Sequence, residues 1–222
     1  DFDVLVIGSG PAGESAALNA VKHGQSVAVV EEQDQVGGAC THQGTIPSKA
    51  LRHMVRQAIR FNRTPIFRDI GDPRTLTYPR LLSHANEVIA RQVAMRSRFY
   101  NRNNIRIIRG HARFADAHTL TVTCSDGREE RFTAGRIIIA TGSRPYRPAN
   151  IDFSHPRVYD SDSILKMTNT PRKIIIYGAG VIGCELAQAF ARLGSHVTLV
   201  QRNARLLPKE DEAASAIVAP SS

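Results

Sequence analysis

One pattern occurs twice in this chain of 222 residues. Each copy has a short apolar run, a GxGxxG loop, a helical stretch closed by another glycine, and a second apolar run that ends in a polar residue. The corresponding positions are Gly8, Gly10, Gly13, Gly24 and Glu31 in the first copy and Gly178, Gly180, Gly183, Gly194 and Gln201 in the second. A GxGxxG loop between a strand and a helix, with a second strand behind it, binds the pyrophosphate of a dinucleotide. The repeat therefore predicts an α/β fold with two Rossmann-like units and two bound nucleotides.

The first copy is typical of a central parallel strand followed by its crossover helix. Asp3 to Ile7 is too uniformly apolar for a strand with one solvated face, and a helix to about His23 and a strand at 27–30 follow. In such a unit the first glycine makes the tight turn, the second lets pyrophosphate approach, and the third lets helix and strand pack closely. Pro11 and Ala12 belong to the same loop. Glu31 is placed to accept hydrogen bonds from a ribose.

The second copy predicts a different nucleotide. Its strands are expected at 173–177 and 197–200, and its loop carries Val181 and Ile182 before the last glycine. A carboxylate at the end of the second strand selects an unmodified ribose, but this copy has Gln201 there, followed by Arg202 and Arg205. This site should accept NADPH and need not reject NADH. The alternative is that the two arginines only line a surface loop.

A third feature lies between the copies, where Gly37 to Lys49 has the sequence GGACTHQGTIPSK. Pro47 suits the first turn of a helix, because its missing N–H would be unpaired there anyway. Thr45 or Ser48 can cap the free amides. The residues before Thr45 therefore lie at a helix N-terminus, which favours a phosphate or an electron-rich ring.

The same stretch resembles the flavoprotein disulfide reductases, which have Gly-Gly-x-Cys-x-x-x-Gly-Cys-x-Pro-x-Lys here and form a disulfide between the two cysteines. Cys40 matches the first cysteine, but Thr45 stands at the second. A threonine hydroxyl forms no disulfide and does not replace a thiolate. Within the family this combination is similar to the soluble pyridine nucleotide transhydrogenases, over residues 40–53.

The resemblance implies bound FAD, with NAD(H) and NADP(H) as substrates. It assigns FAD-binding roles to Gly38, Cys40, Thr41, Thr45, Lys49, Ala112, Thr141 and Gly142, in addition to the first glycine loop and Glu31. It also implies a catalytic ion pair between Lys49 and Glu185 beside the flavin. The implied architecture is a three-layer ββα FAD-binding domain over 1–158, followed by the first part of an NAD(P)-binding domain over 159–222.

The implied reaction is hydride transfer between NADPH and NAD through bound flavin. Two alternatives stay open: a disulfide reductase similar to dihydrolipoamide dehydrogenase, which Thr45 opposes, and a non-catalytic nucleotide-binding fragment. Family members are about twice this long, and the missing C-terminal domain is the one through which the parent enzyme is expected to form a homo-oligomer. We expect neither helix nor strand in the Ala/Ser/Pro-rich end, residues 213–222.

The remaining segments predict helices at 48–62 and 80–100, a loop at 64–79, a strand at 105–108, a hairpin of strands 119–123 and 129–133, and a strand at 136–140. The net charge of +9 reflects 14 arginines against three acids over residues 50–113. Nucleic-acid binding is the less favoured interpretation of this block, because no stacking aromatics or known motif accompany it. No apolar run suits a membrane span, no signal peptide is expected, and the cysteines show no metal-ligand spacing. We therefore expect a cytoplasmic protein with no membrane partner and no metal.

Overall fold

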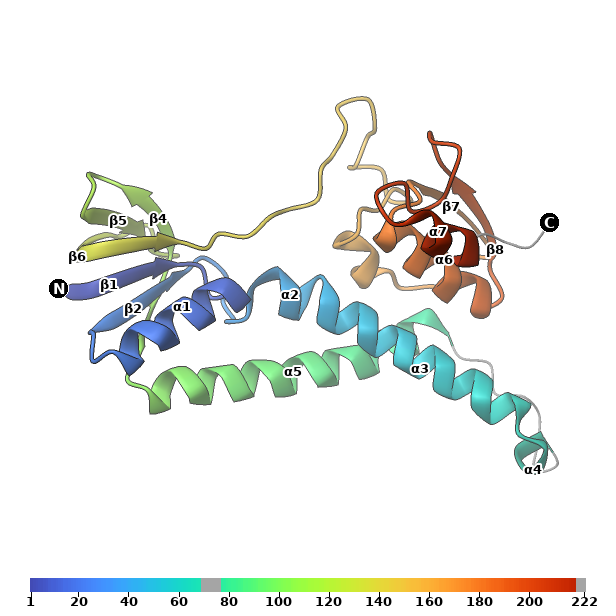
Figure 1. Cartoon of the computed structure of the whole chain (residues 1–222), viewed down its shortest axis with the longest axis horizontal. Coiled ribbons are helices and arrows are strands. Elements are labelled where there is room, and N and C mark those ends of the chain that lie inside the picture. Colours follow the sequence, from blue (N-terminus) through green and yellow to red (C-terminus); the bar gives the residue numbers. More distant parts are fainter. Residues whose placement is uncertain (69–76, 219–222) are drawn as a thin grey trace. The chain divides into compact units, whose positions relative to one another are not determined.

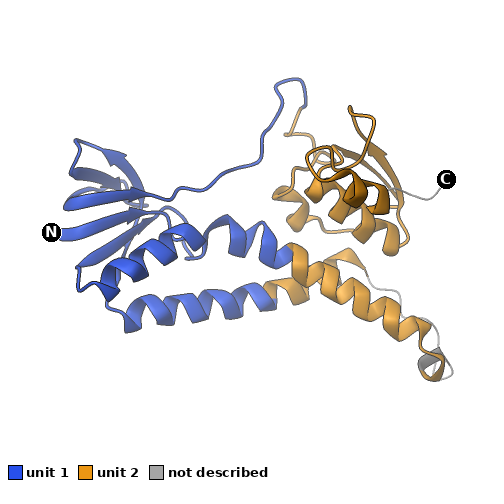
Figure 2. Cartoon of the chain, viewed as in Figure 1, with its two compact units in different colours: residues 1–47, 87–151 blue, residues 48–86, 152–222 orange. Residues whose placement is uncertain are grey.

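The computed structural model describes residues 1–68 and 77–218. The chain divides into two compact units, shown in Figure 2: unit 1 holds 1–47 and 87–151, and unit 2 holds 48–86 and 152–222. Residues 69–76 of the loop predicted at 64–79 and the last four residues of the predicted irregular end lie outside the described residues. The units differ from the predicted domains in that residues 48–86 group with the C-terminal part, and the domain division at 158 stays a prediction.

Unit 1 contains a six-stranded sheet in the order β3-β2-β1-β6-β5-β4 (Figure 1). Its strands are β1 (Phe2–Ile7), β2 (Val27–Glu31), β3 (Arg106–Arg109), β4 (His111–Phe114), β5 (Thr119–Thr123) and β6 (Glu129–Ile139). Strands β3, β2, β1 and β6 are parallel neighbours, whereas β4, β5 and β6 form an antiparallel meander. β1 thus has a parallel partner on each side, as its uniformly apolar sequence predicts.

β6 corrects the prediction of two separate strands at 129–133 and 136–140. It is one strand, which pairs with β5 through residues 129–133 and with β1 through residues 134–139. Gly135 lies within it, and a Cβ added there would come 3.3 Å from the Asp3 carbonyl oxygen. This glycine, which lies between the two predicted strands, marks a close approach of β6 to β1.

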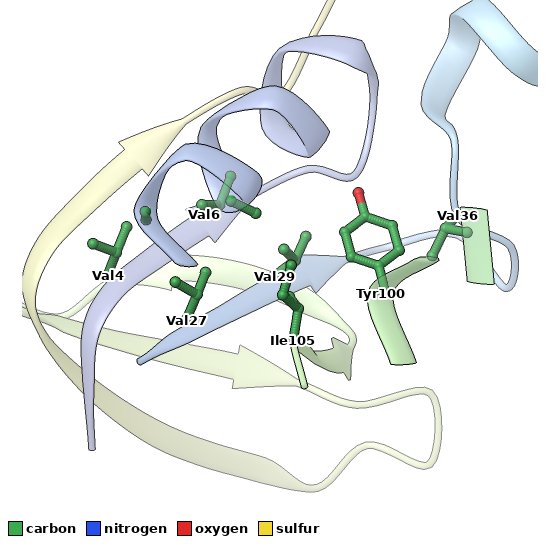
Figure 3. Close-up of a cluster of buried hydrophobic side chains, with 9 residues drawn as sticks. Val4, Val6, Val27, Val29, Val36, Tyr100 and Ile105 are labelled. Atoms are coloured by element: carbon green, nitrogen blue, oxygen red, sulfur yellow. The ribbon is translucent and has the colours of Figure 1, made fainter. Parts of the chain in front are cut away.

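Alternate residues of the parallel strands pack on opposite faces. On one face Val4, Val6 and Val29 pack with Tyr100 and the small side chains of α1 (Pro11–Lys22) (Figure 3). On the other face Leu5 packs with buried residues of the meander. The helices, the parallel strands and the meander form the three layers of the predicted ββα architecture.

The helices after α1 are α2 (Gly38–His42), α3 (Thr45–Arg63), α4 (Pro65–Arg68) and α5 (Tyr78–Arg102). α3 and α5 confirm the two predicted long helices and begin two to three residues earlier. The short helices α2 and α4 were not predicted, and α4 lies where we expected a loop. Gly24 ends α1 in the left-handed region, with φ of +73°, which confirms its role as a helix stop.

Unit 2 contains a two-stranded parallel sheet of β7 (Lys173–Tyr177) and β8 (His196–Val200), joined by α6 (Val181–Arg192), with η1 (Ser163–Lys166) before it and α7 (Glu212–Val218) after it. Its core packs Leu51 and Val55 of α3 with Tyr78 of α5 and Phe190 of α6. The Tyr78 and Phe190 rings are 4.8 Å apart.

α7 corrects the expectation that neither helix nor strand follows residue 212. The helix starts after Asp211, whose Oδ1 accepts a hydrogen bond from the Ala213 N–H at 2.8 Å. The Ser215 hydroxyl inside the helix donates to the Leu206 carbonyl. A capping aspartate therefore starts the helix in a segment whose Ala, Ser and Pro content predicts neither helix nor strand. Across residues 1–68 and 77–218, no helix is long and apolar enough to cross a membrane.

Candidate functional site

The first glycine loop joins β1 to α1 and requires glycine at two positions. The Gly8 N–H donates to the Val30 carbonyl at 2.7 Å, and Gly8 has φ of +101°. A Cβ added at Gly8 would lie 2.4 Å from the Ala140 carbonyl oxygen, and one added at Gly13 would lie 1.9 Å from the Gly8 carbonyl oxygen. Neither approach is compatible with a side chain, so the backbone of the loop depends on both glycines.

Gly10 has a different reason for being glycine. It is the N-cap of α1, with φ of −67° and ψ of −180°, a conformation open to any residue, and no side chain caps the helix. The nearest atom to an added Cβ would be the Gly38 Cα at 3.9 Å. Pro11 and Ala12, the next two residues, are exposed. The first turn of α1 therefore presents amides beside an open space that a Cβ would partly fill, which fits an approaching pyrophosphate.

Glu31 ends β2 next to this loop, and its side chain is buried, with 5% of the residue exposed. Its Oε2 accepts hydrogen bonds from the Ser9 N–H at 2.9 Å and from the Ser9 hydroxyl, and its Oε1 accepts one from the Gln33 N–H at 2.9 Å. These donors hold the carboxylate in place and leave lone pairs for hydroxyl donors. The arrangement fits the ribose of a bound dinucleotide.

Tyr100 of α5 lies under the same loop. Its hydroxyl donates to the Ser9 carbonyl at 3.5 Å. Burial, and secondarily the charge of Glu14, raises the pKa of Tyr100 above its ordinary value. The hydroxyl therefore stays protonated and can act as a donor to the loop backbone.

The stretch from Gly37 forms a turn and the short helix α2. Gly37 and Gly38 both have positive φ, of 118° and 60°. Thr41 is fully buried and its hydroxyl donates to the Gly37 carbonyl at 2.9 Å. A Cβ added at Gly38 would lie 2.8 Å from the Gly10 Cα. The structure therefore brings this stretch directly against the first glycine loop.

Cys40 lies on α2 and is half-buried, and Thr45 begins α3. Cys40, Cys124 and Cys184 are all free thiols. Burial raises the pKa of the Cys184 thiol, which keeps it protonated at neutral pH. Because all three cysteines are free, Cys40 has no disulfide partner in the described structure.

The other residues implied for FAD lie on the sheet of unit 1. Thr141 follows β6 at the point where the Ala140 N–H donates to the Ile7 carbonyl at 2.8 Å, and its Cα would be 3.5 Å from a Cβ on Gly8. Gly142 comes next, with φ of +69°. Ala112 is half-buried on β4 and pairs with Val122. Thr141 is thus adjacent to the glycine loop, whereas Ala112 packs in the meander.

The predicted ion pair between Lys49 and Glu185 is present. The Lys49 Nζ on α3 donates to the Glu185 Oε1 on α6, and the two side chains are 53% and 29% exposed. Both residues belong to unit 2. The pair is only partly shielded from water, so it contributes little to folding stability, of the order of 0–1 kcal/mol.

The second glycine loop repeats the backbone geometry of the first. The Gly178 N–H donates to the Val200 carbonyl at 2.8 Å, Gly178 has φ of +110°, and a Cβ added at Gly183 would lie 1.8 Å from the Gly178 carbonyl oxygen. Gly180 caps α6 without a side-chain partner, and a Cβ there would meet nothing within 4 Å. The side chains of Val181 and Ile182 are exposed. This helix N-terminus is therefore open in the same way as that of α1.

Side chains distinguish the two loops. The Gln201 Oε1 accepts a hydrogen bond from the Ala179 N–H at 3.2 Å, as Glu31 does from the Ser9 N–H. The backbone partner is thus conserved between the copies, but the carboxylate is replaced by a neutral amide. No fixed negative charge at Gln201 opposes a 2′-phosphate.

The two candidate arginines are not equivalent. The Arg205 guanidinium donates to the carbonyls of Pro208 and Glu210 at 3.2 and 3.1 Å and lies 3.5 Å from the Glu212 carboxylate. Arg202 is exposed and forms no ion pair with a carboxylate in the described part of the chain. Arg205 therefore organises its own loop, and Arg202 is the one open to an anionic ligand.

Sequence reasoning missed Ser9, which contacts the carboxylate of Glu31 and the backbone of the stretch from Gly37. The available signal was the paired difference between the copies, Ser9 with Glu31 and Ala179 with Gln201. Among residues 1–68 and 77–218, no group of three or more His, Cys, Asp and Glu side chains could hold a metal ion.

Comparison with known proteins places this geometry in a family. Residues 2–221 match the family model described as pyridine nucleotide-disulphide oxidoreductase. Over 207 residues the chain is 58% identical to the soluble pyridine nucleotide transhydrogenases of Pseudomonas putida KT2440 and Pseudomonas fluorescens Pf-5, covering 93% of this chain and 45% of each relative. Among solved structures it is similar to the HOCl-induced flavoprotein disulfide reductase RclA from Escherichia coli, with a TM-score of 0.82 and 29% identity, covering 97% of this chain and 46% of that one. The chain thus spans about half the length of these relatives. It belongs to the pyridine nucleotide-disulphide oxidoreductase family.

Proposed function

We propose that this protein is an FAD-dependent NAD(P)⁺ transhydrogenase of the Si-specific type, which moves hydride between NADPH and NAD without a redox-active disulfide. The observation that carries the proposal is a chain with two nucleotide-type glycine loops and no paired thiol. The loops share their backbone hydrogen bonds but differ at Glu31 and Gln201, and all three cysteines are free. Two nucleotides with different ribose requirements and no dithiol favour direct exchange between a flavin and nicotinamides.

The first loop is the proposed FAD site. Its open helix N-terminus at Gly10 suits the pyrophosphate, and Glu31 is proposed to accept the adenosine ribose hydroxyls. The close contact between Gly38 and Gly10 supports the same assignment for the stretch that carries Cys40, Thr41 and Thr45. When bound, FAD accepts hydride from one nicotinamide and returns it to another. Thr141, Gly142 and Ala112 are assigned to the FAD site on the strength of the resemblance.

The second loop is the proposed nicotinamide site. Gly180 leaves the α6 N-terminus open, and Gln201 contributes no negative charge. Arg202, exposed and unpaired with described carboxylates, is the proposed contact for the 2′-phosphate of NADPH. A site that attracts this phosphate without requiring it accepts both nicotinamides in turn, as a transhydrogenase needs.

The role proposed for Lys49 is electrostatic. Its ammonium forms an ion pair with Glu185, which gives the cation a charged partner where it is shielded from water. An ammonium beside a flavin favours negative charge on the ring system. Glu185 is accordingly proposed as the residue that orients Lys49.

Two other functions remain as alternatives. A disulfide reductase similar to dihydrolipoamide dehydrogenase needs two thiols in the stretch from Gly37, and this chain has Cys40 and Thr45. A non-catalytic nucleotide-binding fragment is compatible with the length of the chain relative to its relatives. We further propose a cytoplasmic location, a division into an FAD-binding domain (1–158) and part of an NAD(P)-binding domain (159–222), and homo-oligomers in the parent enzyme.

The test is the visible spectrum of the purified chain. We expect flavin absorption at one FAD per chain, bleached by NADPH under anaerobic conditions and restored by NAD⁺. The matched control is oxidised lipoamide, which a disulfide reductase would use to restore the colour in place of NAD⁺. Restoration by lipoamide alone would favour the disulfide reductase, and a chain without flavin after incubation with FAD would refute the transhydrogenase proposal for this chain.

A further inference from the structure

We propose that Ser9 is a positioning residue for the FAD site: its hydroxyl holds one oxygen of Glu31 so that the other is presented to the adenosine ribose. This inference rests on the proposed function, since it concerns the ligand assigned to the first glycine loop. Nothing in the GxGxxG pattern requires serine at this position, which is the first variable residue of the pattern.

Ser9 is fully buried, and its hydroxyl both donates and accepts a hydrogen bond. Its hydroxyl donates to the Glu31 Oε2 and accepts from the Gly37 N–H at 2.9 Å. Its own N–H donates to the same Oε2 at 2.9 Å. One serine therefore connects the glycine loop, the acid at the end of β2 and the start of the stretch from Gly37.

The two oxygens of Glu31 are consequently not equivalent. Among the described residues, Oε2 has two donors, both from Ser9, whereas Oε1 has one donor, the Gln33 N–H. A carboxylate oxygen accepts about two hydrogen bonds, so Oε2 is filled and Oε1 keeps capacity for a hydroxyl donor. Because rotation of the carboxylate would break the bonds from Ser9, Oε1 is held as the oxygen that a ribose hydroxyl meets.

The second loop provides an internal comparison. There the residue between the first two glycines is Ala179, and the residue opposite is Gln201. In the described part of the chain the backbone bond alone remains, from the Ala179 N–H to the Gln201 Oε1 at 3.2 Å. The hydroxyl donor is thus present where the acceptor is a buried carboxylate and absent where it is a neutral amide. A buried charge needs more donors than an amide does, which explains why the two substitutions occur together.

The experiment compares two ligands on the full chain after flavin removal. FAD is the first, and an FAD analogue whose adenosine is 2′,3′-dideoxy is the second, because it cannot donate to Glu31. Binding is followed by flavin fluorescence for the wild-type chain, Ser9→Ala and the control Ser26→Ala. Ser26 also donates to a carboxylate in unit 1, Asp3 at 2.7 Å, but at the other end of β2.

We expect Ser9→Ala to raise the Kd for FAD about 10-fold, the value of one hydrogen bond to a charged group. The Kd for the analogue should change by less than about twofold, because that ligand makes no bond for Ser9 to support. Ser26→Ala should leave both Kd values within the same limit. Thermal unfolding of each variant establishes that the fold is kept. Should Ser9→Ala not fold, Ser9→Cys keeps the side-chain size with a weak donor and takes its place.

Equal weakening of FAD and the analogue would mean that Ser9 acts through packing or through Gly37, and would overturn the inference. Unchanged binding of both ligands would overturn it as well. A wild-type chain that binds neither ligand would overturn the proposed function together with this inference, which separates the two kinds of failure.

Discussion

Replacing Gly10 with alanine separates the fold of the first glycine loop from the binding role proposed for it. The backbone there, with φ of −67° and ψ of −180°, is open to alanine, and the added Cβ would meet only the Gly38 Cα at 3.9 Å. Alanine is a poorer N-cap than glycine by about 0.5–1 kcal/mol. It also restricts the unfolded chain, which offsets about 0.4–1 kcal/mol. The free energy of unfolding should therefore change by less than about 1 kcal/mol.

Binding should change far more. A pyrophosphate that reaches the amides of α1 must approach the Gly10 backbone closely, and the methyl group would occupy that space. Loss of one charge-assisted hydrogen bond costs about 1.5–3 kcal/mol, which corresponds to a Kd for FAD raised about 10- to 150-fold. Flavin titration with urea unfolding of the same samples measures both quantities.

Gly180→Ala is the matched variant in the second loop. Its backbone, with φ of −75° and ψ of −174°, is equally open to alanine, and no atom lies within 4 Å of the new Cβ. We expect it to leave FAD binding unchanged and to weaken NADPH binding. If Gly10→Ala bound FAD as tightly as the wild type, or if Gly180→Ala released the flavin, the assignment of the two loops would be wrong.

Three other predictions follow from the same structure. Arg202→Ala should raise the KM for NADPH by about 10-fold or more and leave the KM for NADH nearly unchanged. Arg205→Ala should change the KM for both nicotinamides alike, because it loosens the loop held at Pro208 and Glu210. The reverse pattern would exchange the roles of the two arginines. Lys49→Met should keep the free energy of unfolding within about 1 kcal/mol of the wild-type value, because the ion pair is partly exposed. The same variant should slow flavin reduction by NADPH in stopped-flow measurements. An unchanged rate would remove Lys49 from the proposed catalytic residues. Phe190→Ala removes a fully buried ring packed on Tyr78 and should lower the free energy of unfolding of unit 2 by about 3–5 kcal/mol in urea unfolding. A decrease below about 1 kcal/mol would contradict the packing described.

Most of the fold follows from local patterns in the sequence. The glycine spacing predicted both βαβ units, and the uniform apolar run of β1 predicted its central place in the parallel sheet. Alternation predicted β5, whose Leu120 and Val122 are buried while its three threonines are half-buried. These features can be predicted locally, because strand burial and glycine conformation restrict which residue types occur at each position.

Two of the misses, Gly135 and Ser9, depend on contacts distant in sequence, whereas α7 depends on a local cap. Gly135 lies in β6 because its backbone passes close to Asp3, a neighbour in space and not in sequence. α7 forms because Asp211 caps it, which the Ala/Ser/Pro composition of the segment hides. The role of Ser9 depends on a carboxylate 22 residues away, and no local rule distinguishes it from any other loop serine.

The two loops also show where nucleotide preference can reside in this chain. Their backbones match in the turn at Gly8 and Gly178, in the bonds these glycines donate to Val30 and Val200, and in the open N-caps. A difference in ligand therefore has to come from side chains, and the residues that differ at the ribose end are the pairs Ser9–Glu31 and Ala179–Gln201. A carboxylate fixed by three donors opposes any further negative charge, so it suits an unmodified ribose and disfavours a 2′-phosphate. An amide that accepts one backbone hydrogen bond leaves that choice to exposed neighbours such as Arg202, as the proposed use of NADPH and NADH at one site requires.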